Sequence, residues 1–134
     1  MGVRAIVGGM LIAAALGTSA CASGAALQQQ NRTRLGALQV GMGRVGVLQH
    51  MGYATARSDF RVVKNPYHVD RYTVPHHRIE VLWYLTGTKQ EGDGIAPDEV
   101  TPVVLVDGRL AGWGWPFWRE LVQTHGIATE PLPS

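Results

Sequence analysis

The sequence is poor in cysteine, with Cys21 as the only one among 134 residues. A single cysteine excludes any disulfide within the chain, so cross-links cannot support a small core. Long hydrophobic runs are also lacking, because the apolar run at 5–17 is shorter than the roughly 20 residues that a membrane-spanning helix needs. We therefore expect a mature domain that folds on its own hydrophobic core, without disulfides or a spanning helix.

A large excess of charge is missing as well. The formal net charge is +2, and the basic residues are scattered singly among acidic ones. A nucleic-acid-binding surface needs a stripe or patch of lysine and arginine that follows the phosphate backbone, and no such stripe is present. The composition therefore argues against nucleic acid as a partner.

The start of the chain is typical of an export signal. Arg4 precedes the apolar run, and the small residues at 18–20 follow it. A charged start, a short apolar run and a small-residue cleavage zone predict a secretory signal peptide at 1–20.

Cys21 directly follows this predicted leader. Its position resembles a bacterial lipobox, in which the cysteine after the signal is acylated and becomes the new N-terminus. This resemblance predicts Cys21 as the lipidation site and a lipid anchor in the membrane. Because Ala22 rather than an aspartate comes next, the resemblance implies an outer membrane lipoprotein that faces the periplasm. The alternative is ordinary cleavage, which leaves Cys21 as a free thiol.

Composition divides the remainder into a tether, a domain and a tail. Residues 21–31 are small and polar, with only Leu27 to bury, which predicts a flexible tether. Hydrophobic patterning begins near residue 32 and predicts one small domain at 32–118. The polar residues 119–134 are expected to form a C-terminal tail.

Three glycines spell the G-x-G-x-x-G of a dinucleotide-binding loop: Gly41, Gly43 and Gly46. A dinucleotide site also needs a buried strand before the loop and a long helix after it, and both are missing here. A short helix explains the segment better, with Gly43 at the N-cap and Gly52 as the left-handed stop. Its expected inner stripe consists of Val45, Leu48 and Met51.

The segments beyond Tyr53 predict an antiparallel sheet. "DFRVVKN" and "YHVDRYTV" are short and β-rich, and the Asn65-Pro66 turn interrupts them. Asp107-Gly108 has the residues of a tight hairpin turn, with arms at 103–106 and 109–113. The strongest strand alternates, with one face formed by Ile79, Val81, Trp83 and Leu85 and the other by Arg78, Glu80, Leu82 and Tyr84.

No catalytic, cofactor or metal constellation is expected. His68 and Asp70 share one face of a strand, but strong metal-ligand spacing is lacking. Ser58 lies in a polar turn without the glycine elbow of a serine nucleophile. Asp98 and Glu99 are adjacent on an expected exposed turn, which lacks the perturbed environment that acid–base catalysis needs. The sequence therefore predicts that the protein is not an enzyme.

The tryptophans are the remaining candidates for a site. We expect Trp83 and Trp113 in the core, because large aromatic residues of a small domain are mostly buried. Pro116 cannot donate to a β-ladder, so the strand should end there. Three aromatic residues are the predicted partner-binding site, unless the tail folds back over the sheet: Trp115, Phe117 and Trp118.

Several blocks resemble a known group of proteins: "LQVGMGRVGVLQHMG", "NPYHVDRY", "EVLWYLTG" and "DGIAPDEVTPVVLVDGRLAGWGWPFW". They are similar to an uncharacterised family of small bacterial envelope lipoproteins, related in fold to the BamE (SmpA/OmlA) lipoproteins. The resemblance implies an α+β fold, in which two short N-terminal helices pack on one face of a three- to four-stranded antiparallel sheet. It also implies an envelope location and no catalytic activity.

Two functions follow as expectations. The first is a non-catalytic bacterial envelope lipoprotein that acts as a binding or scaffolding module for an envelope protein. Outer-membrane assembly or envelope maintenance is the setting that the resemblance suggests. The alternative is a soluble periplasmic ligand-binding or inhibitor-type protein with a free Cys21.

Overall fold

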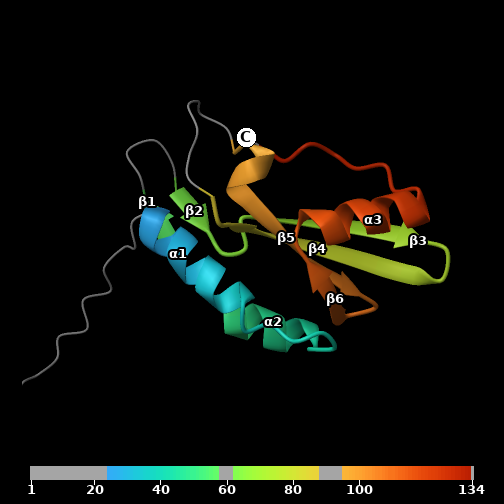
Figure 1. The fold of residues 1–134 in the computed structure, drawn as a ribbon, viewed down its shortest axis with the longest axis horizontal. Helices are drawn as coiled ribbons and strands as arrows, with labels where there is room; N and C mark the ends of the chain where they lie inside the picture. The colour runs from blue at the N-terminus through green and yellow to red at the C-terminus, as the bar shows by residue number, and fades with distance from the viewer. Residues whose placement is uncertain (1–23, 58–61, 88–94, 134) are drawn as a thin grey trace, which may run out of the picture.

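A computed structural model describes residues 24–57, 62–87 and 95–133 (Figure 1). The predicted leader and Cys21 lie outside these described residues. The helices are α1 Gly24–Leu35, α2 Arg44–Met51, the short 3-10 helix η1 Pro97–Glu99, and α3 Trp115–His125. The strands are β1 Thr55–Arg57, β2 Val62–Lys64, β3 His68–Val74, β4 His77–Leu85, β5 Val100–Val106 and β6 Arg109–Trp113.

The centre of the fold is a four-stranded antiparallel sheet with the order β3-β4-β5-β6. The strands β1 and β2 form a separate two-stranded sheet. The predicted α+β class is confirmed, because helices cover an antiparallel sheet whose neighbouring strands are also neighbours in sequence.

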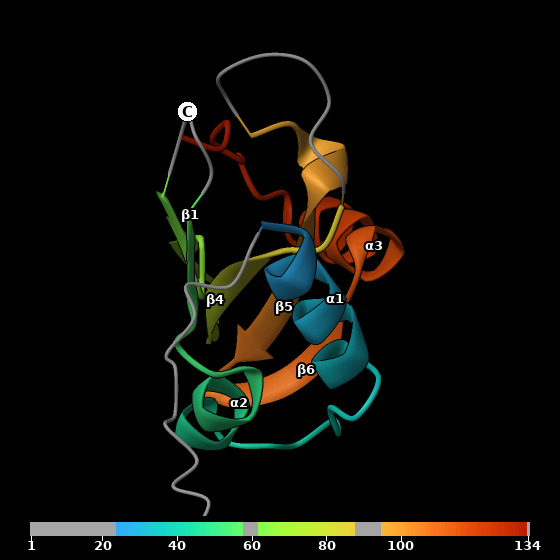
Figure 2. The same cartoon turned by 90° about the vertical axis from the view of Figure 1, so that its left-hand side faces the viewer.

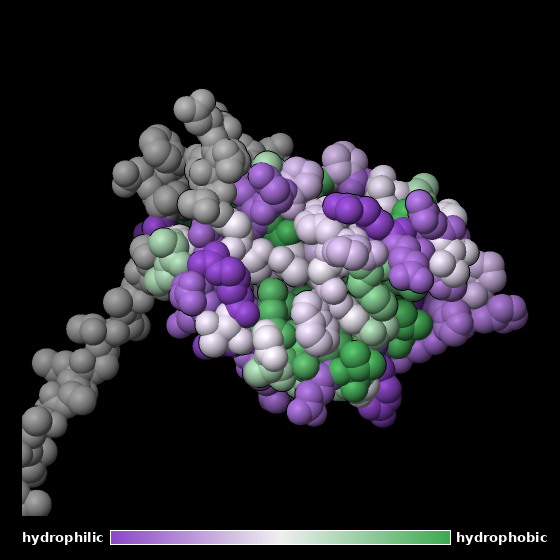
Figure 3. Space-filling view, viewed as in Figure 1, coloured by the Kyte–Doolittle hydropathy of each residue, from purple (hydrophilic) through white to green (hydrophobic). Residues whose placement is uncertain are grey.

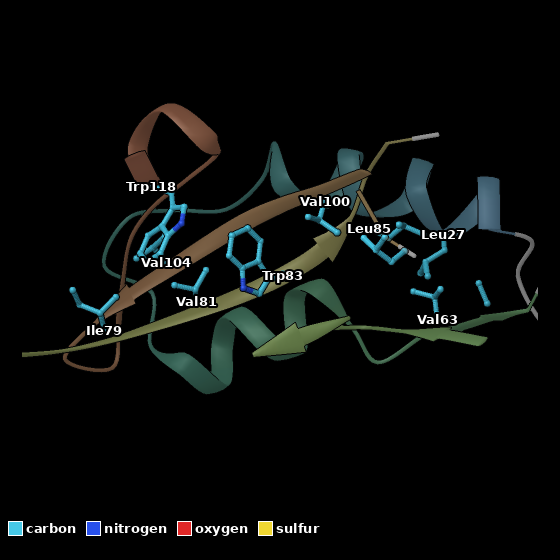
Figure 4. Packing of buried hydrophobic residues seen from close by; sticks show 11 residues of the cluster. Leu27, Val63, Ile79, Val81, Trp83, Leu85, Val100, Val104 and Trp118 are labelled. Carbon is cyan, nitrogen blue, oxygen red and sulfur yellow. The ribbon is translucent and has the colours of Figure 1, made fainter. Parts of the chain in front are cut away.

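Strand β4 carries the core on both of its faces. Figure 4 shows Ile79, Val81 and Trp83 in one apolar cluster, as their spacing of two residues predicts. Leu82 and Tyr84 lie in a second cluster on the opposite face. Both halves of the predicted alternation are therefore confirmed, and the sheet needs a helical cover on each side.

The helices supply this cover from two directions. The α2 residues Val47, Leu48 and Met51 pack in the cluster of Leu82 and Tyr84. Helix α3 packs against the other face, and Figure 2 shows α2 and α3 on opposite sides of the sheet. The resemblance implied helices on one face only, and the third helix corrects that expectation.

The flexible tether predicted at 21–31 is wrong from Gly24 onward, because α1 begins there. Leu27 and Asn31 are fully buried. The Asn31 amide donates to the Leu85 carbonyl at 2.7 Å and to the Asn65 side chain at 3.0 Å. Polar residues that suggest a tether in sequence are thus satisfied inside the domain, which allows their burial.

The predicted tail at 119–134 also needs correction, because α3 runs from Trp115 to His125. Pro116 lies in the first turn of this helix, where its missing N–H has no intrahelical partner to lose. The strand does end before Pro116, but the chain continues as a helix.

Helix α2 has the predicted ends, with Gly43 at the N-cap and Gly52 at a positive φ of 75°. Its expected inner stripe is partly wrong, because Val45 is 65% exposed and Val47 is buried instead. The predicted hairpin turn is confirmed, with Asp107 at φ 51° and Gly108 at φ 80° between β5 and β6.

Candidate functional site

The predicted partner-binding residue Trp118 is buried, with only 3% of its surface exposed. Its ring packs edge-on against Trp83, with centroids 6.3 Å apart, and lies 5.7 Å from Tyr72. Figure 4 shows its side chain reaching from α3 toward the sheet. The prediction of an exposed Trp118 is wrong, because α3 turns this residue into the core.

Phe117 and Trp115 also face the sheet. The Phe117 ring lies directly over Gly112, where an added Cβ would come within 2.7 Å of the ring. The Trp115 indole N–H donates to the Val100 carbonyl at 2.9 Å, and its ring centroid lies 5.3 Å from that of Trp83. Both residues are partly buried and help to attach α3, so they do not form a free patch.

Trp113 packs in the cluster on the α2 side and is only partly buried. Trp115 packs against the cluster on the opposite face of the sheet, although residues two apart in a continuous strand would share a face. The chain leaves the strand at Gly114, whose φ of 92° turns it into α3. The glycine lets the chain make this turn, because positive φ costs it little.

The other chemical candidates show no constellation in the described part of the chain. His68 Nε2 and Asp70 Oδ1 are 2.8 Å apart, and Asp70 also accepts from the Trp83 indole at 2.7 Å. Within the described residues, no group of three potential ligands is placed to hold a metal ion. Glu99 is buried rather than exposed, and its carboxylate accepts from the Ala96 amide. Ser58 lies outside the described residues.

The two edges of the sheet differ in their cover. Edge strand β6 is closed by the segment before α2, since the Gly41 amide donates to Leu110 and the Leu110 amide donates to Met42, both at 2.8 Å. The Arg44 amide adds a bond to Gly108 at 3.0 Å. At the opposite edge, β3 is paired with β4 alone. Strand β3 therefore forms the open edge of this sheet in the described part of the chain.

The pairing pattern decides which backbone groups of β3 face outward. Successive residues of an antiparallel strand direct their amide and carbonyl groups to opposite sides. The Asp107 amide donates to the Arg78 carbonyl at 2.8 Å, so Arg78 faces β5 and Ile79 faces β3. Tyr72 is the partner of Ile79 and faces β4. By alternation, three β3 residues direct their backbone groups outward: Val69, Arg71 and Thr73.

None of these three residues has a backbone hydrogen bond to a segment beyond β4 in the described part of the chain. Their side chains share the face that α2 only partly covers, since Arg71 lies opposite Glu80 and Val69 lies opposite Leu82. A hollow of about 470 Å³ lies at the start of β3, lined by Tyr53 and Val69 among others. A second hollow of about 380 Å³ lies farther along the strand, lined by Arg44, Arg71, Thr73 and Arg78 among others.

We call this region the β3 edge surface, formed by Arg44, Tyr53, Val69, Arg71, Thr73 and Arg78. Tyr53 is 64% exposed and is one of the large hydrophobic residues that the fold leaves on the surface. Figure 3 shows hydrophilic residues at the end of the molecule where the β3–β4 hairpin turns, and apolar residues between α2 and α3. The β3 edge surface thus combines free backbone groups with charged and aromatic side chains.

Positive charge is in excess on this surface. Glu80 is mostly buried, with 14% of its side chain exposed, and it joins two arginines. Arg44 Nε lies 2.6 Å from one of its carboxylate oxygens, and Arg71 Nε lies 3.0 Å from the other. The hydrogen bond with Glu80 raises the pKa of Arg44. Arg78 lines the same hollow and lies next to Asp107, so this region has three guanidinium groups and two carboxylates.

Tyr84 is a second polar group behind this region. It is fully buried, and its hydroxyl has no hydrogen-bond partner among the described residues. Burial raises the pKa of Tyr84, with a further contribution from nearby Tyr53. The phenol therefore stays neutral, and it adds no charge to oppose the arginines.

Sequence reasoning missed the β3 edge surface entirely. Arg71 and Glu80 lie opposite each other only because of the β3–β4 register, and Arg44 joins them only because α2 docks on the sheet. The available signal was the alternation in "YHVDRYTV", which places Val69, Arg71 and Thr73 on one face. It does not say that this strand lies at an edge.

A family model described as "Protein of unknown function (DUF3192)" matches residues 10–119. Neither the curated proteins nor the solved structures gave a match to this chain. In the described residues, every helix is too short or too polar to cross a membrane.

Proposed function

The chain belongs to the DUF3192 family, and we propose that it is a non-catalytic, membrane-tethered binding module of the bacterial envelope. The observation that carries this proposal is the β3 edge surface. On this surface, three residues of β3 direct unpaired backbone groups outward, and hollows lined by basic side chains lie along the same strand. These features are typical of a surface that binds an extended segment of another protein.

The proposed anchor is an acyl group on Cys21. Helix α1 begins at Gly24, and Leu27 and Asn31 attach it to the domain. Only residues 22 and 23 separate the proposed lipid anchor from a docked helix, so the domain would be held close to the bilayer. Stable anchoring takes more than one acyl chain, which is what lipoprotein processing supplies.

A binding role is favoured over catalysis because the candidate groups are engaged in structural contacts. Glu80 joins Arg44 and Arg71, while Asp70 accepts from Trp83 and contacts His68. We extend the proposal to an outer membrane location facing the periplasm, to a role in outer-membrane assembly or envelope maintenance, and to a fold relationship with the BamE lipoproteins.

The anchor is tested by fractionating cells that express the wild type or Cys21→Ser. The wild type should sediment with outer membranes, and the variant should move to the soluble fraction or remain unprocessed. A wild type that is already soluble would contradict the anchor and favour a soluble periplasmic binding protein.

The binding surface is tested separately by photo-crosslinking in intact cells. A photo-reactive amino acid at Thr73, which is exposed on the β3 edge surface, should form a discrete protein adduct. The matched control carries the same group at Gln123, which is exposed on α3. Equal labelling from both positions, or no adduct from Thr73, would contradict a binding role for β3.

A further inference from the structure

We infer that the β3 edge surface binds an extended acidic segment of another envelope protein, which joins the sheet as an additional antiparallel strand beside β3. This inference rests on the proposed binding function and names the class of partner. Two independent features carry it, namely the free backbone groups of the strand and the sign of the charge around them.

The backbone gives the added strand its bonds. Val69, Arg71 and Thr73 direct their amide and carbonyl groups away from β4, and within the described residues no other segment pairs with them. An exposed edge of this kind is a template for another extended chain. The opposite edge at β6 is closed by the segment of Gly41 and Met42, so only β3 offers this template in the described part of the sheet.

The charges select the partner. Arg44 and Arg71 both contact the carboxylate of Glu80, Arg78 lines the same hollow, and Lys64 lines the neighbouring hollow. Among the described residues, Glu80 bonds only to the Nε atoms of Arg44 and Arg71, so their terminal nitrogens remain available as donors. Guanidinium groups bind carboxylates with strong, charge-assisted hydrogen bonds. An acidic side chain on the incoming strand therefore complements this surface.

The spacing along β3 predicts a pattern in the partner. A partner residue directly opposite Arg71 has its side chain on the same face as Arg71, within reach of the arginines. A partner residue two positions away lies opposite Val69, next to the hollow lined by Tyr53. The expected segment therefore has an acidic residue at one position and an apolar residue two positions along, on the same face.

A second copy of this chain does not fit the same edge. Arg71 is the central residue of β3, His68–Val74. Two β3 strands paired antiparallel about this centre would place Arg71 beside Arg71 of the other copy, and like charges directly opposite each other are unfavourable. The arginine thus disfavours self-pairing while it attracts an acidic segment.

The test uses purified protein and a fluorescent peptide of seven residues, the length of β3, with aspartate at its centre and valine two positions to either side of it. Binding is followed by fluorescence anisotropy. Arg71→Gln should weaken binding about tenfold or more, in line with the loss of a hydrogen-bonded charge. The matched control is Arg57→Gln, an exposed arginine of β1, which should bind as the wild type does. A peptide with lysine in place of aspartate should not bind.

N-methylated peptides test strand addition itself. In an antiparallel ladder, the residues opposite Arg71, Val69 and Thr73 direct their amides toward β3. Methylation of the amides of the central aspartate and of the residues two positions to either side should abolish binding. Methylation of the amides between these positions should leave binding intact. If both methylated peptides bind equally, strand addition is wrong.

Two other results would overturn the inference. If anionic vesicles bind in an Arg71-dependent way and the peptide does not, the surface recognises lipid phosphate rather than protein. If the peptide does not bind and Arg71→Gln forms dimers, the arginine only prevents self-pairing. Either result could occur while the Thr73 crosslink persists, which would leave the proposed binding function in place and remove only the acidic strand.

Discussion

Replacing Trp118 with alanine should destabilise the domain more than any other tryptophan substitution outside β4. Trp118 is 3% exposed and contacts Trp83 and Tyr72 through ring packing. Sequence reasoning predicts the reverse order, in which Trp113 is core and Trp118 is dispensable. The experiment therefore separates the observed fold from the sequence-based expectation.

The size of the effect follows from the buried area. A buried tryptophan removes up to about 250 Å² from water, which at about 25 cal/mol per Å² gives an upper bound of about 6 kcal/mol. Residual compactness of the unfolded chain lowers such sums by about 10–40%, so a loss of about 4 kcal/mol is expected. This value agrees with the roughly 3–5 kcal/mol of other buried aromatic truncations. It would lower Tm by about 15 °C or more in a domain of about 100 residues.

Urea unfolding followed by circular dichroism measures the loss without relying on the removed fluorophore. Trp113→Ala is the comparator, and because Trp113 is only partly buried it should lose about 1–2 kcal/mol. Trp118→Phe keeps an apolar ring and should lose less than Trp118→Ala. A Trp118→Ala variant with unchanged stability, or a Trp113→Ala variant that is the less stable of the two, would refute the packing of α3 described above.

Three further predictions test other parts of the fold. Gly112→Ala should lower the free energy of unfolding by about 1–3 kcal/mol, because the added Cβ would lie 2.7 Å from the Phe117 ring. A double-mutant cycle with Phe117→Leu should show coupling between the two positions, and strictly additive effects would contradict the contact. Asn31→Ala should lose about 2–4 kcal/mol by leaving the Leu85 carbonyl and buried Asn65 without their partner, whereas exposed Gln30→Ala on the same helix should lose little. The pKa of Asp107 is lowered first by the hydrogen bond from the Arg78 backbone amide and then by the one with His77. The charged Asp107 carboxylate therefore stabilises the folded state above its ordinary pKa of 3.8, and this stabilisation is lost as the pH falls through the lowered pKa. The Tm difference between the wild type and Asp107→Asn should therefore shrink on acidification, and a difference that grows would contradict this sign.

Local signals in the sequence predicted a substantial part of the fold. Gly43 and Gly52 mark the ends of α2, and Asp107-Gly108 marks the β5–β6 turn, because positive φ and capping depend on residues close in sequence. The alternation around Trp83 predicted the two faces of β4, because strand geometry has a period of two whatever the strand packs against.

The β3 edge surface could not be predicted in the same way. Arg71 and Glu80 are nine residues apart, and Arg44 is 36 residues from Glu80, so the cluster exists only once strand register and helix docking are set. The order of the strands is also a property of the whole sheet. It decides that β3 lies at an open edge, while the segment of Gly41 and Met42 closes β6.

By itself, the sequence determined the secondary structure that depends on nearest neighbours: the strand alternation, the hairpin turn and the limits of α2. Only the tertiary structure decided which polar and aromatic residues are buried. Asn31 is polar yet fully enclosed because Asn65 and Leu85 supply its hydrogen bonds, and Trp118 is core because Gly114 turns α3 onto the sheet. Burial depends on the two surfaces that meet, and one of them comes from a distant part of the chain.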